Sequence, residues 1–202
     1  MLTNGREGKI KHIGLCGVSS SALRRAYAVA PVAAIQTTYS PFVRSIEGPD
    51  GTDLLSTCRE LGVAVVSSSP LGRGLLTGAF TTTDSVSGAD DIRAKQMPWW
   101  SEENLPTNAK IVEQLGSFAA KKQCSVAQLT LAWILKQGIE NFAIPGTKKA
   151  KYLRENWNAL GVSLSDEEEA EIRKFVESIE LAGFRSVPEA RALTYVDTVE
   201  EA

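Results

Sequence analysis

The strongest constraint on the fold of this chain is a repeated alternation of short apolar runs with helix-forming segments. The apolar runs lie at residues 11–15, 32–38, 63–67 and 141–145, and each has the length of a buried β-strand. Strands that are separated by helices pair in parallel, because the helix carries the chain back along the sheet. The sequence therefore predicts an α/β fold in which helices cover a parallel sheet.

Six segments are predicted to be helices from their composition, periodicity or capping residues: 22–30, 52–61, 107–122, 125–136, 149–160 and 166–180. Ser125 and Gln128 form a capping-box pattern, and Ser165 is a residue type that favours the start of a helix. A polar stretch at about 79–106 is longer than most connections, so we expect a functional loop there. The end of the chain, about 182–202, is predicted to be an irregular tail.

Four strand–helix units are compatible with two architectures. A doubly wound open sheet can be built from four or five strands, whereas a (β/α)8 barrel requires eight strands and about 250 residues. Because the chain has 202 residues and four predicted strands, counting alone favours the open sheet.

The composition argues against several classes of function. Lys and Arg number 22 against 24 Asp and Glu, a net charge of -2, so no basic surface for nucleic acid or an anionic membrane is expected. No stretch approaches the roughly 20 apolar residues that a membrane-spanning helix needs. The cysteines Cys16, Cys58 and Cys124 lie far apart, which predicts neither a disulfide framework nor a metal site and is typical of a cytoplasmic protein.

The single histidine, His12, lies at the start of the first predicted strand. Catalytic groups of parallel α/β folds gather at the opposite, C-terminal ends of the strands. His12 is therefore predicted to be structural, and a hydrolytic Ser-His-Asp or Cys-His site is not expected.

A glycine-rich turn follows the third predicted strand, within residues 67–78. Its glycines, Gly72, Gly74 and Gly78, allow backbone N–H groups to approach an anion, but their spacing differs from the dinucleotide-binding fingerprint. The pattern alone is equally compatible with phosphate contact and with an ordinary turn.

A second small-residue turn follows the fourth predicted strand and enters a helix whose first turn contains Lys148, Lys149 and Lys151. Cations at a helix N-terminus oppose the helix dipole, and a bound anion would offset that repulsion, although a solvated basic face is the alternative. Barrels bind phosphate after strands seven and eight, so two such turns favour the barrel over the open sheet.

Five segments in register resemble the aldo-keto reductase family: residues 8–15, Gln36 with 39–42, residues 69–78, Gln128 and Leu129 with Ala132 and Trp133, and 144–147 with Glu155 and Asn156. The chain is similar to the C-terminal half of these enzymes, and most of all to the fungal, plant and bacterial reductases related to potassium-channel β subunits. The resemblance implies strands five to eight of a (β/α)8 barrel, with residues 1–202 as a partial barrel domain. It also implies binding of NADP(H) and reduction of an aldehyde or ketone by hydride transfer.

The resemblance also implies a role for particular positions in this chain. Gln36 would bind the carboxamide side of the nicotinamide. The pyrophosphate would be wrapped by Ser69, Pro70, Leu71, Gly72, Arg73, Gly74 and Leu75. Thr147 and Lys148 would hold the 2′-phosphate, while Glu155 and Asn156 would contact the adenine. The segments 91–93 and 98–100 resemble the loop that closes over cofactor and substrate.

The sequence also departs from the family pattern. The family's catalytic Asp, Tyr, Lys and His lie on the first four strands, so no catalytic residue is assigned to this chain. Cys16, Gly17 and Ser68 stand where the family usually has nicotinamide-binding or ring-stacking residues.

The expected function is therefore that of an NADP-dependent reductase of a small carbonyl substrate whose chain lacks the N-terminal catalytic half. A non-catalytic nucleotide-binding or regulatory protein, or a decayed paralogue, is the alternative. Half a barrel exposes strand edges, so either a missing N-terminal half or self-association is expected.

Overall fold

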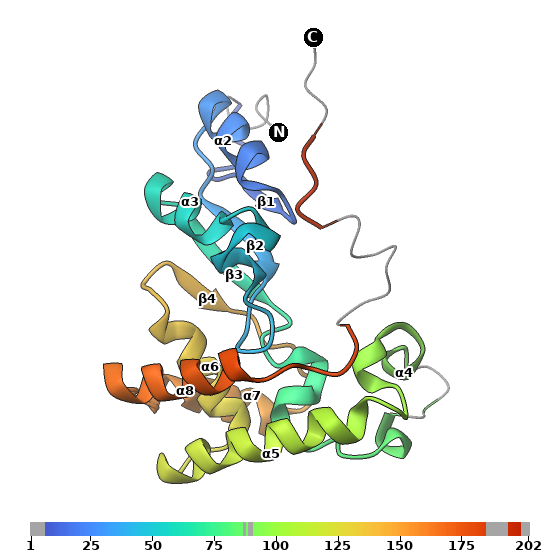
Figure 1. The fold of residues 1–202 in the computed structure, drawn as a ribbon. Coiled ribbons are helices and arrows are strands. Elements are labelled where there is room, and N and C mark those ends of the chain that lie inside the picture. The colour runs from blue at the N-terminus through green and yellow to red at the C-terminus, as the bar shows by residue number, and fades with distance from the viewer. Residues whose placement is uncertain (1–6, 87, 89–90, 185–193, 199–202) are drawn as a thin grey trace.

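A computed structural model describes residues 7–86, 88, 91–184 and 194–198 of the chain. Its centre is a parallel sheet of four strands in chain order: β1 (Gly14–Cys16), β2 (Ala34–Thr38), β3 (Ala64–Ser68) and β4 (Asn141–Ala143) (Figure 1). The prediction of an α/β fold with a parallel sheet is confirmed. The predicted limits of β1 were wrong, because its ladder with β2 begins only where Gly14 faces Ala34.

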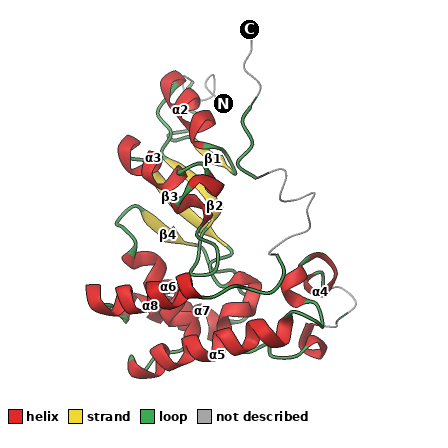
Figure 2. Ribbon diagram, in the orientation of Figure 1, coloured by secondary structure: helices red, strands yellow, loops and turns green. Residues whose placement is uncertain are grey.

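The six predicted helices are present, with ends that differ by a few residues. They are α2 (Ser20–Val29), α3 (Leu54–Leu61), α5 (Leu105–Lys121), α6 (Val126–Lys136), α7 (Ala150–Asn158) and α8 (Asp166–Ser178). The capping box of Ser125 and Gln128 is formed at the start of α6, and Ser165 forms a second one with Glu168 at the start of α8. Helices α5 to α8 gather on the β4 side of the sheet (Figure 2).

Short helices occupy much of the stretch at about 79–106 that was predicted to be a loop. They are the 3-10 helices η4 (Thr83–Val86) and η5 (Pro98–Trp100) and the α-helix α4 (Arg93–Gln96). Trp99 and Trp100 of η5 are buried, at 5% and 0% exposure. This connection therefore contributes to the core, while its residues 87, 89 and 90 lie outside the described part.

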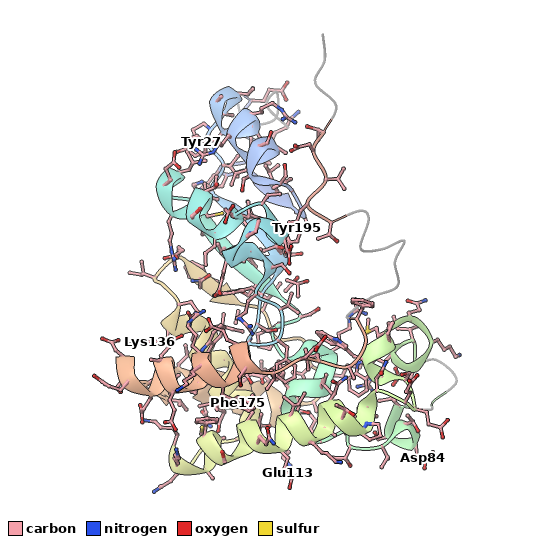
Figure 3. All side chains as sticks on the ribbon, in the orientation of Figure 1. Tyr27, Asp84, Glu113, Lys136, Phe175 and Tyr195 are labelled. Atoms are coloured by element: carbon pink, nitrogen blue, oxygen red, sulfur yellow. The ribbon has the colours of Figure 1, made fainter. Side chains whose placement is uncertain are left out.

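The end of the chain, predicted to be irregular, is described at 182–184 and 194–198, and the rest lies outside the described residues. Val196 forms a parallel β-bridge with Val18, just beyond β1. The Tyr195 hydroxyl lies 3.3 Å from Thr37 Oγ1, so this segment reaches the C-terminal ends of the first two strands (Figure 3).

A cluster of polar and aromatic groups connects α8 with the segment after β2. Arg173 of α8 forms ion pairs with Glu47 at 3.0 Å and with Glu169 at 3.0 Å, and its guanidinium lies 5.2 Å from the Trp133 ring centroid. The Tyr39 hydroxyl donates a hydrogen bond to Glu47, and burial together with this carboxylate raises the pKa of Tyr39. The cluster holds the C-terminal end of β2 against α6 and α8.

The two faces of the sheet differ in how they are covered. Ile35 and Val65 are in register on the helix-covered face and are 1% and 0% exposed. Cys16, Gln36 and Phe142 are in register on the other face; the first two are exposed and Phe142 is 54% exposed. Parallel sheets are normally covered on both faces, so the open face is unusual.

Helix α7 directs its polar side inward and its apolar side to solvent. Leu153 and Trp157 of α7, with Leu160 of the 3-10 helix η6 (Ala159–Gly161) that follows it, have the i, i+4, i+7 spacing of one helical stripe and are 61%, 71% and 62% exposed. No residue of α7 is buried. This stripe and the open face of the sheet are apolar surfaces that the described residues leave uncovered.

Candidate functional site

A cavity of about 890 Å³ lies between the turn after β3 and helix α7. The first wall consists of Ser69, Pro70, Leu71, Arg73, Gly74, Thr77, Ala79 and Phe80. The opposite wall consists of Pro145, Gly146, Thr147, Lys151, Tyr152, Arg154, Glu155, Asn156 and Asn158. Arg93 and, from the start of α6, Ala127 and Gln128 complete the lining. The volume is within the about 300–1,000 Å³ of typical small-molecule sites.

The turn that forms the first wall is a run of left-handed backbone. Gly72, Arg73 and Gly74 have φ values of 57°, 56° and 107°, and Ser69 before them has 49°. The Gly72 N–H donates to the Ser69 carbonyl at 2.9 Å, which closes the first bend. Residues other than glycine rarely adopt such angles, so the backbone here is held in a strained shape that is common at ligand sites.

Gly74 is the position in this turn where a side chain would crowd its neighbours. A Cβ atom there would lie 2.9 Å from the Phe80 ring and 3.1 Å from Arg93 Nη1. Both neighbours line the cavity. The glycine therefore keeps the wall close to the segment that folds over it.

Arg93 of α4 connects the segment that follows the turn back to the turn itself. Its guanidinium donates to the Arg73 carbonyl at 3.2 Å and lies 4.4 Å and 4.8 Å from the ring centroids of Phe80 and Trp100. Asp91 accepts from the same guanidinium at 2.6 Å, and this hydrogen bond holds the pKa of Asp91 below its usual value. Sequence reasoning singled out this segment, but not the contact of Arg93 with the turn, which joins residues 20 positions apart.

The second wall is formed by the start of α7. The Thr147 hydroxyl accepts a hydrogen bond from the Lys149 N–H at 3.1 Å, which shapes the entry to the helix. The ammonium groups of Lys149 and Lys151 each lie 5.8 Å from the Tyr152 ring centroid. The Gln128 side chain donates to the Glu155 carbonyl at 3.3 Å and so ties α6 to α7.

The cavity has more positive than negative charge. Arg93 is compensated by Asp91, whereas Arg73, Lys151 and Arg154 form no ion pair among the described residues. Glu155 is the one carboxylate that lines the described cavity. Such a site favours an anionic ligand. Within the described part of the chain, no cluster of three or more His, Cys, Asp or Glu residues could hold a metal ion.

The sequence profile of the Aldo/keto reductase family matches residues 4–177. The chain belongs to this family. Aldo-keto reductase str7 of Strobilurus tenacellus is 49% identical over 181 residues, which are 90% of this chain and 53% of that protein. Aldo-keto reductase yakc [NADP(+)] of Schizosaccharomyces pombe is 41% identical over 191 residues, which are 95% of this chain and 55% of that protein. The chain thus spans about half the length of these curated relatives.

Two solved structures of aldo-keto reductases or related dehydrogenases are similar to the chain. The glycerol dehydrogenase AKR11B4 from Gluconobacter oxydans superimposes with a TM-score of 0.76 and 25% identity, over 99% of this chain and 55% of that one. The thermostable aldo-keto reductase Tm1743, solved with the inhibitor epalrestat, superimposes with a TM-score of 0.64 and 27% identity, over 87% of this chain and 52% of that one.

The described part of this chain contains no helix long and apolar enough to span a membrane.

Most positions that the aldo-keto reductase resemblance singled out meet at the cavity. These are Ser69, Pro70, Leu71, Arg73, Gly74, Thr147, Glu155 and Asn156. Gly72 and Leu75 belong to the same turn but are buried beneath its surface. Gln36 and Lys148 are exposed and do not line the cavity, Gln36 because its strand turns it to the open face of the sheet.

The residues assigned to the cofactor from the sequence do not include Phe80, Lys151, Tyr152 or Arg154, which line this cavity, and Lys151 was noted only as part of a basic run that could bind an anion. Lys151 and Arg154 are three residues apart, and Glu155 is four after Lys151, a spacing that places all three on one helical face. Once the start of α7 is known to be Ala150, this spacing indicates that the three side chains point the same way.

Proposed function

We propose that this chain forms the NADP(H)-binding part of an aldo-keto reductase that reduces a small aldehyde or ketone. The observation that carries the proposal is the cavity, which combines a left-handed glycine turn with unpaired cations in a chain of this family. The name of the yeast relative yakc specifies NADP(+). NADPH would supply the hydride for the carbonyl carbon.

The residues present fit a phosphate-bearing dinucleotide. A Cβ atom at Gly74 would meet the Phe80 ring and Arg93, which both line the cavity, and the charge of the lining is positive. Ser69, Leu71 and Arg73 would hold the pyrophosphate on the first wall, where the glycine turn brings backbone close to the ligand. Glu155 and Asn156 on the opposite wall would accept and donate hydrogen bonds at the adenine.

We further propose that the four strands are strands five to eight of a (β/α)8 barrel. The uncovered face of the sheet, the outward apolar stripe of α7 and the half-length match to relatives support this assignment. In such a barrel the open face would point to the interior, and the family's proton-donating residues would belong to strands one to four. We therefore assign no catalytic residue to the described chain.

A binding protein without reductase activity is a second candidate. Gln36 lies outside the cavity, and its Oε1 lies 3.8 Å from Cys16 Sγ. The family resemblance places nicotinamide-binding groups at these two positions. Without contacts to the nicotinamide, the dinucleotide would be held only at its phosphate and adenine end. The chain would then bind NADPH without positioning the nicotinamide for hydride transfer.

Calorimetric titration of the 202-residue chain with NADPH, followed by a carbonyl-dependent NADPH oxidation assay, tests these functions. We expect saturable binding that weakens when Arg73 is replaced by alanine, and no carbonyl reduction by this chain alone. Absence of binding would contradict both candidates. Turnover of a generic aldehyde would contradict the assignment of catalysis to other strands.

The chain alone is expected to self-associate through its uncovered apolar surfaces. The double substitution Leu153→Ser and Trp157→Ser should shift the mass measured by light scattering toward 21.8 kDa, since these two side chains are 61% and 71% exposed. Ile139→Ser is the matched control, because Ile139 is 98% exposed in a turn. A monodisperse monomer before any substitution would contradict this prediction.

A further inference from the structure

Strand β1 lies at one edge of the sheet. It pairs with β2 on one side, where Gly14 faces Ala34, and no strand of the described sheet pairs with its other side. The backbone N–H and carbonyl groups of such an edge can pair with a strand of another chain. Proteins commonly block this pairing with charged residues, proline or a covering segment. Because β1 contains neither a charged residue nor a proline, its edge has to be covered by another part of the chain.

Residues 194–198 lie against this edge, directly beyond the last residue of β1 (Figure 1). Val196 forms a parallel bridge with Val18, and the Tyr195 N–H donates a hydrogen bond to the Gly17 carbonyl at 3.3 Å. The Gly17 N–H donates instead to a carbonyl of β2, at 3.0 Å. The segment therefore continues the parallel sheet past β1.

Gly17 makes this arrangement possible through its backbone conformation. In a regular strand the N–H and the carbonyl of one residue face the same neighbour, whereas those of Gly17 bond to two different neighbours. Its φ of 65° is in the left-handed region, which glycine adopts readily. A Cβ atom at Gly17 would meet nothing within 4 Å, so glycine is required here by its φ angle and not by lack of space.

Polar contacts specify which part of the chain covers the edge. Ser19, the N-cap residue of α2, donates a hydrogen bond to the Asp197 carboxylate, which is thereby placed near the positive end of the helix dipole. Arg25 of α2 donates to the Thr198 carbonyl at 2.9 Å. These contacts join residues 178 and 173 positions apart. The segment is therefore held in place by the fold and not by its neighbours in the sequence.

We propose that residues 194–198 cover the β1 edge within the same chain and exclude a strand of a second copy from pairing there. An extended segment is the kind of partner that a free strand edge binds, since main-chain hydrogen bonds supply affinity and side-chain contacts supply specificity. In the proposed barrel this edge faces strand four, so a strand added along β1 has to end before Gly17 or displace the segment. None of these contacts involves the dinucleotide cavity, so covering of the edge does not depend on cofactor binding.

Disulfide trapping in the full chain tests this pairing. Val18→Cys and Val196→Cys are introduced together, with Cys16→Ser because Cys16 is an exposed free thiol. Paired strand residues lie about 5 Å apart, within the range that a disulfide can span. We expect mild oxidation to give a monomer with an internal disulfide, formed at a rate that does not depend on protein concentration. Non-reducing electrophoresis and peptide mass mapping identify the product.

Val29→Cys with Val196→Cys, again with Cys16→Ser, is the matched control. Val29 is an exposed valine at the far end of α2, about 14 Å along the helix from its first residue. We expect no internal disulfide in this variant.

Two further substitutions release the segment from the edge. Asp197→Ala and Gly17→Ala, each added to the trapping pair, should slow the internal disulfide about fivefold, because one removes a hydrogen bond and the other disfavours the left-handed backbone. Each should also raise the share of disulfide-linked dimers, since the uncovered edge can then pair with a second copy. Gly17→Asn should retain the fast internal reaction, because asparagine tolerates the left-handed region.

A disulfide-linked dimer as the main product of the trapping pair would overturn the proposal, because the edge would then bind the segment of a second copy. Absence of any disulfide would overturn it as well, since the segment would not occupy the edge. If Asp197→Ala and Gly17→Ala leave the rate and the share of dimers unchanged, the contacts described above do not keep the edge covered. Circular-dichroism melting curves verify that each variant is folded.

Discussion

Gly74→Ala is expected to weaken NADPH binding at least about tenfold and to lower the free energy of unfolding by about 2 kcal/mol. The φ angle of 107° is one that alanine strongly disfavours, and the added Cβ would lie 2.9 Å from the Phe80 ring. Movement of Arg93 is restrained, because its guanidinium donates a hydrogen bond to Asp91 at 2.6 Å. The turn and the segment folded over it must therefore move apart, which changes the wall of the cavity.

Calorimetric titration with NADPH and urea unfolding measure the two effects separately. Gly161→Ala is the control, since a Cβ atom there meets nothing within 4 Å and the residue does not line the cavity. We expect this control to bind NADPH like the unmodified chain. If Gly74→Ala also binds with unchanged affinity, the turn is not the phosphate-binding wall.

Gly51→Ala is expected to lower the free energy of unfolding by about 3 kcal/mol, or to prevent folding. The added Cβ would lie 2.7 Å from Ile46 Cα and closer still to the Ser45 carbonyl. Backbone atoms cannot rotate away as a side chain can, so the 3-10 helices η1 (Ser45–Glu47) and η2 (Pro49–Gly51) must separate. Separation would also displace Glu47 from Tyr39 and Arg173.

A close control lies three residues earlier in the same turn. Gly48 has an extended backbone with φ -141°, and a Cβ atom there meets nothing within 4 Å. Gly48→Ala should therefore cost less than about 1 kcal/mol in urea unfolding. Equal stabilities of the two variants would show that the packing of η1 against η2 is not a constraint on the fold.

The local features of the fold could be predicted from the sequence because neighbouring residues encode them. The alternation of apolar runs with helical segments predicted the parallel sheet, and the capping residues Ser125 and Ser165 predicted the starts of α6 and α8. The glycine-rich turn after β3 was recognised as a candidate anion site from its composition, and its resemblance to aldo-keto reductases extended this to a dinucleotide. These signals depend on backbone preferences and hydrogen bonds within a few residues.

The tertiary structure decided which residues line the cavity. Lys148 and Lys151 are the same residue type three positions apart, and only the point at which α7 begins, Ala150, determines that the second one faces the cavity. Arg93 reaches the Arg73 carbonyl across 20 residues, a contact that no local pattern encodes.

The exposed apolar stripe of α7 also depends partly on the local sequence and partly on the tertiary structure. The sequence by itself predicted the helix at 149–160, and the spacing of Leu153, Trp157 and Leu160 in the printed letters puts these apolar residues on one helical face. Only the tertiary structure decided that this apolar stripe points to solvent and the polar side to the cavity. The physical reason is that periodicity specifies which residues share a face, whereas the elements packed around a helix decide where that face points.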